Sequence, residues 1–422
     1  MIGALSVLLA EYSFMEPTSP NTVVYGVVGV AGLIFGIALQ RGQFDPVQMF
    51  GDLVYQRNGW LARGFMYFFG IGILSVGIIT FFTGKMPPTK PSGPLAFIGS
   101  FILGFGSALG GASAVSLVHK IGEGRVSAVL QTFAIFVAWV VMVPFVARPA
   151  VSFNREFGGF GWPWSTPLLT LKGPGEPILG VKLGVLVYGV VASIAFAAIS
   201  YYLAKNYSPE GGMPQMNEVK KKVADGGRVV KSDAASLSSA FKKAFATPER
   251  LWDPRVAGTI AVFANTIFFV SYQIWGADAL PGMFRGAGPL GFIASYFVWP
   301  VFGFTVPQWF PGEWWWAGTK ALPGLAIGTW AYIVAILGAF LAAVWYQDFK
   351  IRTPPKGKKL NRYALSILGG FGIALGVRLA LACDCAGFLT AISTQANLVG
   401  LVYAVGIFPG MYAGFKVKRM LM

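Results

Sequence analysis

The chain has 422 residues, of which 55% are hydrophobic and only 12% are charged. Soluble domains carry about 25% charged residues, so this sequence lacks the polar coat that a soluble fold of this length needs. The net charge is +16, but the basic residues cluster in short stretches between long apolar runs, which is typical of membrane proteins and argues against nucleic-acid binding. We therefore predict an integral membrane protein, with membrane lipid as its surroundings and no nucleic acid as partner.

The long apolar segments predict the transmembrane helices, because a membrane-spanning helix needs about 20 largely apolar residues. Nine segments meet or approach that length: Thr22–Gln40, Leu61–Phe82, Leu95–Leu109, Val126–Val146, Leu179–Leu203, Val256–Tyr272, Leu325–Tyr346, Tyr363–Ala382 and Leu398–Phe415. We expect an all-α integral membrane protein with about nine transmembrane helices.

A polar, lysine-rich stretch follows the fifth segment and divides the chain. We expect an N-terminal membrane half of five spans (1–204), a basic cytoplasmic linker (205–253) and a C-terminal membrane half of four spans (254–422). With nine spans, the basic residues of the linker, of Lys350–Arg362 and of the C-terminal tail all fall on one side. The positive-inside rule then predicts a multi-pass cell membrane protein with its N-terminus outside and its C-terminus in the cytoplasm.

Three apolar segments are too short to span a membrane: Asp45–Tyr55, Ala112–Lys120 and Cys383–Thr394. Short helices at membrane depth occur where they line a cavity or are buried in protein. We predict that these segments are re-entrant half-helices.

Two of the short segments belong to longer stretches that resemble each other. Phe101–Ile121 can be laid over Phe371–Ile392 so that Ala112 meets Cys383. The charge argument makes the two stretches enter from opposite sides, which is the mark of two inverted pseudo-repeats with a binding site near the midplane. Gly110 and Gly111 come directly before a half-helix and are candidate site residues, although glycines also serve close helix packing.

The second stretch carries unusual polar residues. Arg378 and Asp384 flank Cys383, and ionisable groups inside a membrane are commonly functional. The alternatives are that Arg378 reaches out to the interface and that Asp384 caps a helix. Cys383 at a helix N-terminus would gain thiolate character, whereas Cys385 should point away from it; a buried inert thiol is the alternative for both.

The sequence resembles the YeeE/YedE family of sulfur-compound transporters in three places. These are LIFGIALQRGQFDPVQMFGD (Leu33–Asp52), GFGSALGGASAVSL (Gly104–Leu117) and RLALACDCAGF (Arg378–Phe388). The resemblance implies a thiosulfate-type permease whose central cysteines hand the anion along the path. Of those cysteines only Cys383 is retained, because Asp45 and Ala112 stand at the positions of the other two, and an aspartate there would repel an anion.

Together these patterns predict a permease-like protein for a sulfur-containing anion such as thiosulfate, not an enzyme, with no cofactor and no metal. A soluble sulfur carrier or another protein at the basic linker is the expected partner. The alternative is a non-transporting subunit that anchors or scaffolds a larger respiratory or sulfur-metabolising complex. The predicted substrate-binding residues are Cys383, Cys385, Asp384, Gly110, Gly111, Ala112, Asp45 and Arg378.

Overall fold

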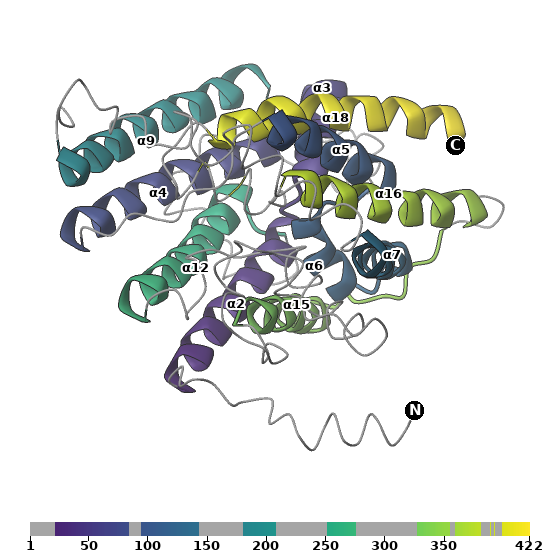
Figure 1. Cartoon of the computed structure of the whole chain (residues 1–422), viewed down its shortest axis with the longest axis horizontal. Helices are drawn as coiled ribbons and strands as arrows, with labels where there is room; N and C mark the ends of the chain where they lie inside the picture. Colours follow the sequence, from purple (N-terminus) through teal and green to yellow (C-terminus); the bar gives the residue numbers. More distant parts are fainter. Residues whose placement is uncertain are drawn as a thin grey trace, which may run out of the picture.

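The computed structural model describes residues 22–83, 94–142, 180–207, 251–275, 327–354, 359–380, 389, 392 and 399–422. Within these ranges the chain is helical, with one isolated bridge between Arg125 and Arg352 and no strand. Figure 1 shows the helices as one bundle.

The helices fall close to the expected segments. Their bounds are α2 (Thr22–Gly42), α3 (Pro46–Tyr55), α4 (Trp60–Thr83), α5 (Pro94–Gly110), α6 (Ala114–Gly122), α7 (Val126–Met142), α9 (Gly180–Asn206), α12 (Pro254–Trp275), α15 (Ile327–Trp345), α16 (Lys359–Ala380) and α18 (Val399–Leu421).

The prediction of a multi-pass helical membrane protein is confirmed. Eight helical segments of the described chain are long and apolar enough to span a membrane. The remaining expected span coincides with α7, which has 17 residues in the described part of the chain.

Two of the three expected short helices are present as α3 and α6, each directly after a break in a longer segment. The third, Cys383–Thr394, lies outside the described residues except for Leu389 and Ile392. Re-entry into the membrane and the inverted repeat stay predictions.

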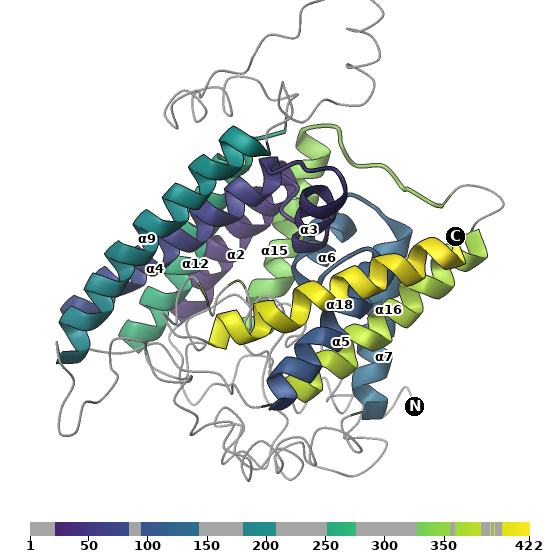
Figure 2. The same cartoon turned by 90° about the horizontal axis from the view of Figure 1, so that it is seen from above.

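Glycines let the helices pack at close range. Helix α5 lies between α16 and α18 (Figures 1 and 2). A Cβ atom on Gly106 would lie 2.7 Å from the backbone nitrogen of Ile373 in α16, and one on Gly104 would lie 2.2 Å from the carbonyl oxygen of Ile407 in α18. Gly104 and Gly106 therefore serve helix contact.

Backbone hydrogen bonds gather several basic segments at one end of the bundle. Trp252 N–H donates to Arg41 C=O (2.9 Å), and Gly59 N–H donates to Tyr207 C=O (2.6 Å), so both ends of the linker lie there. Lys350 N–H donates to Glu123 C=O (3.2 Å). We call this region, which also holds the C-terminal end of α18, the basic end.

Candidate anion site

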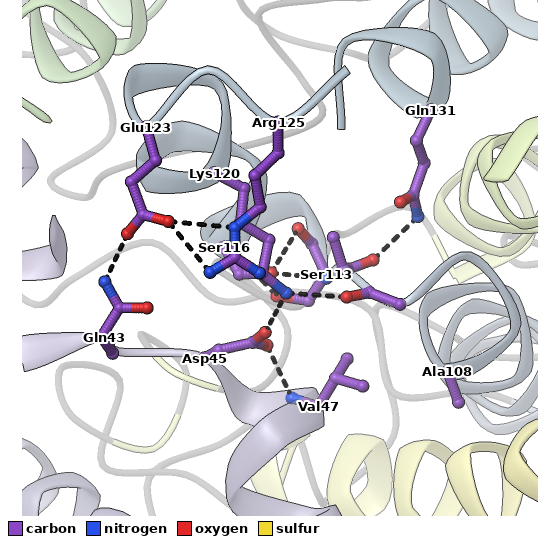
Figure 3. A network of polar contacts seen from close by, with 12 residues as sticks. Gln43, Asp45, Val47, Ala108, Ser113, Ser116, Lys120, Glu123, Arg125 and Gln131 are labelled. Carbon is purple, nitrogen blue, oxygen red and sulfur yellow. Dashed lines mark hydrogen bonds and ion pairs between the residues drawn. The ribbon is translucent and has the colours of Figure 1, made fainter. Parts of the chain in front are cut away.

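After the two breaks, helices α3 and α6 each begin with an N-capping residue (Figure 3). Asp45 has extended backbone angles and accepts a hydrogen bond from Val47 N–H (2.9 Å), with proline following as the first helical residue. Ser113 caps α6 and exchanges hydrogen bonds with Ser116 in a capping box. These caps fix both breaks locally.

Lys120 joins the two breaks. It lies in the last turn of α6, pairs with the Asp45 carboxylate and donates to Gly111 C=O at 2.7 Å. The Asp45 side chain is 1% exposed and that of Lys120 is 9% exposed, so this ion pair is buried. The repulsion of an anion expected from Asp45 is therefore offset by the partner charge of Lys120.

A second ammonium group reaches the same loop from α18. Gly111 has a φ of +83°, and a Cβ atom on it would lie 2.9 Å from Lys418 Nζ. Lys418 also donates to Ala108 C=O at 3.3 Å. Glycine is thus required at 111 both for its left-handed backbone and for the approach of the lysine.

Two pockets open on either side of this point and share Gly111 and Lys418 as a common wall. The aspartate pocket, of about 350 Å³, lies between α3, α6 and α18 and is lined by Asp45, Val47, Gln48, Gly51, Asp52, Tyr55, Gln56, Gly111, Lys120, Phe415, Lys418 and Arg419. The arginine pocket, of about 460 Å³, is lined by Leu109, Gly110, Gly111, Arg125, Ser127, Arg352, Thr353, Pro354, Arg362, Leu365, Ser366, Lys418 and Met422.

Glu123 ties the loop after α6 to distant segments. Its side chain is 1% exposed, accepts from Arg125 Nε at 3.0 Å and from Gln43, and lies 3.6 Å from Arg352. Burial alone would raise the pKa of Glu123, but the neighbouring His119, the two arginines and the Gln43 hydrogen bond together hold it below its usual value. The carboxylate therefore stays charged and holds the two arginines at the edge of the arginine pocket.

The structure brings four of the predicted site residues together. Asp45 and Gly111 meet at Lys120, while Ala112 C=O accepts a hydrogen bond from Gln131 (2.8 Å). A Cβ atom on Gly110 would lie 2.4 Å from the same Gln131 amide. Residues that are distant in sequence thus form one cluster. Cys383, Asp384 and Cys385 lie outside the described residues.

Arg378 lies apart from this cluster. Its side chain is buried and its guanidinium group stacks 3.5 Å above the Trp139 ring. Helix α16 touches Gly110 at Gly369, nine residues earlier in the chain. That separation corresponds to about 14 Å along the helix.

Sequence reasoning missed the lysines and arginines of the pockets. Lys120 had one signal, since it is a charged residue at the end of an apolar segment. Lys418 and Arg362 had no local signal, because they meet Gly111 and Gly110 only through the packing of α16 and α18 on α5. In the described part of the chain, no group of three His, Cys, Asp or Glu side chains is placed to hold a metal ion.

The sequence is similar to proteins of sulfur transport. The family model described as "Sulphur transport" matches residues 41–413. "Probable transporter YedE" of Salmonella typhimurium is 28% identical over 102 residues, which are 24% of this chain and about a quarter (25%) of that relative. The resemblance to the YeeE/YedE family is confirmed. Because the family match covers most of the chain, including both breaks, the protein belongs to the sulphur transport family.

Proposed function

We propose that this protein is a permease for a small sulfur-containing anion such as thiosulfate. The observation that carries the proposal is the convergence of Lys120 and Lys418 on Gly111, at the wall between two pockets of a sulphur transport family member. Asp45 compensates Lys120, whereas Lys418 forms no salt bridge within the described residues. Lys418 therefore offers a positive charge to an anion at this point.

The proposed path continues to Cys383. The repeat predicted from the sequence sets Cys383 against Ala112, the residue that follows Gly111. In this proposal the anion passes between the lysines and the cysteine. The basic end faces the cytoplasm, with the N-terminus outside, as the positive-inside rule predicts.

Uptake of radiolabelled thiosulfate into proteoliposomes tests the proposal. We expect wild-type uptake above that of empty liposomes, and a loss of about tenfold or more in Lys418→Met, because a charge-assisted contact with the anion is removed. Lys416→Met is the matched control, since Lys416 is exposed on the same helix and lines neither pocket. Cys383→Ala tests the cysteine separately. Absent wild-type uptake, or equal uptake in Lys418→Met and Lys416→Met, would contradict the proposal.

A further inference from the structure

The arginine pocket gathers several positively charged side chains. Four cationic side chains line it, and they come from four separate segments: Arg125 before α7, Arg352 after α15, Arg362 in α16 and Lys418 in α18. Among the described residues that line it, no side chain carries a carboxylate. Like charges are thus held together by the packing of the helices.

The neighbouring acid compensates only part of this charge. Glu123 lies 2.9 Å from Arg125 and 3.6 Å from Arg352, and it does not line the pocket. Arg362 and Lys418 form no salt bridge with any residue that the structure describes. Among the described side chains, four cations beside the one carboxylate of Glu123 leave an excess of positive charge at the pocket.

The rest of the lining suits an oxyanion. Hydroxyl groups of Ser127, Thr353 and Ser366 supply neutral donors beside the guanidinium groups. Ser127 lies in the first turn of α7, where the helix dipole favours negative charge. Guanidinium groups match the oxygen atoms of tetrahedral oxyanions with paired donors. The volume of about 460 Å³ lies in the range of small-molecule sites, roughly 300–1,000 Å³.

We propose that the arginine pocket is a second binding site, which takes a tetrahedral oxyanion with two negative charges. The chemical group is a sulfate or phosphate type, either as a free ion or as the phosphate monoester headgroup of an acidic lipid. An excess of positive charge favours a dianion over a monovalent anion. The site shares Lys418 with the proposed permease path, but Arg362 lines only the arginine pocket. Loss of sulfate binding in Arg362→Gln and loss of thiosulfate uptake in Lys418→Met are therefore separate results.

Calorimetric titration of the full-length protein in a neutral detergent with inorganic sulfate tests the site. We expect Arg362→Gln to weaken binding roughly tenfold or more, because one charge-assisted contact is lost. Arg362 is exposed at the start of α16 and lines only the arginine pocket, so its replacement leaves the buried core and the aspartate pocket intact. Lys416→Gln removes the same charge from outside both pockets and should bind sulfate like the wild type.

Three results would overturn the proposal. One is that the wild type binds neither sulfate nor phosphate and retains no phosphatidic acid. Another is an equal loss in Arg362→Gln and Lys416→Gln, which would reduce the effect to general surface charge. Chloride at matched ionic strength should not displace sulfate, and displacement by chloride would also contradict a dianion site.

Varying the lipid composition distinguishes a lipid headgroup from a free ion as the source of the oxyanion. In nanodiscs of phosphatidylcholine with or without phosphatidic acid, native mass spectrometry counts retained lipids. Selective retention of phosphatidic acid that is lost in Arg362→Gln identifies a lipid headgroup. Sulfate binding without such retention identifies a free ion. Either result supports the site, and failure of both overturns it.

Discussion

Replacement of Lys120 by methionine tests the central ion pair. Methionine keeps most of the length of the side chain but removes the ammonium group, so the Asp45 carboxylate stays buried, 1% exposed, without its counter-charge. Removing one partner of a buried ion pair costs about 3–5 kcal/mol. We therefore expect Lys120→Met to lower the free energy of unfolding by that amount.

The double variant Asp45→Asn/Lys120→Met should recover part of the loss. Asparagine can still accept from Val47 N–H and cap α3, so only the charge disappears. We expect a coupling energy of about 1–3 kcal/mol between the two positions. Equilibrium unfolding in mixed detergent micelles measures Asp45→Asn, Lys120→Met and the double variant, with Lys416→Met as the exposed control. A cost below about 1 kcal/mol for Lys120→Met, or strictly additive costs in the double variant, would refute a buried, mutually dependent pair.

Three further predictions concern backbone and charge. Gly111→Ala should lower the free energy of unfolding by about 1–3 kcal/mol, because alanine is strained at positive φ and meets Lys418. Gly104→Ala should cost about 1–3 kcal/mol, because its Cβ atom would press on the backbone of α18. Glu123→Gln should be less stable than the wild type at neutral pH. Since the folded pKa of Glu123 is lowered, that difference should persist above its ordinary value of 4.5 and shrink as pH falls below it.

Matched controls keep these outcomes informative. Gly26 is exposed in α2, and a Cβ atom on it would meet nothing within 4 Å, so Gly26→Ala should gain about 0.5–1 kcal/mol. A Gly111→Ala or Gly104→Ala protein as stable as Gly26→Ala would contradict the described close contacts. A stability difference of Glu123→Gln that grows toward acid pH would contradict the sign of the Glu123 pKa shift. Thermal or detergent unfolding of purified protein reads out each comparison.

The apolar runs predicted the helices because membrane depth fixes their length. The sequence placed the short helices within two residues of α3 and α6, since aspartate or serine caps and glycine breaks are local signals.

The pockets could not be read in the same way. Lys120 pairs with Asp45 across 75 positions of sequence, and Lys418 reaches Ala108 across 310. No periodicity links such residues, because only the packing of separate helices brings them together. By contrast, the position of Arg378 near Cys383 in the sequence suggested a site residue, but its guanidinium group lies over the Trp139 ring, away from the cluster around Gly111.

Counterflow exchange tests the central claim most directly, because it needs no knowledge of the driving ion. Proteoliposomes loaded with unlabelled thiosulfate are diluted into a trace of external labelled thiosulfate. The account predicts transient accumulation of label in liposomes with the wild-type protein and in the Lys416→Met control, and strongly slowed accumulation with Lys418→Met. Label that enters no faster than into protein-free liposomes would contradict a sulfur-anion permease.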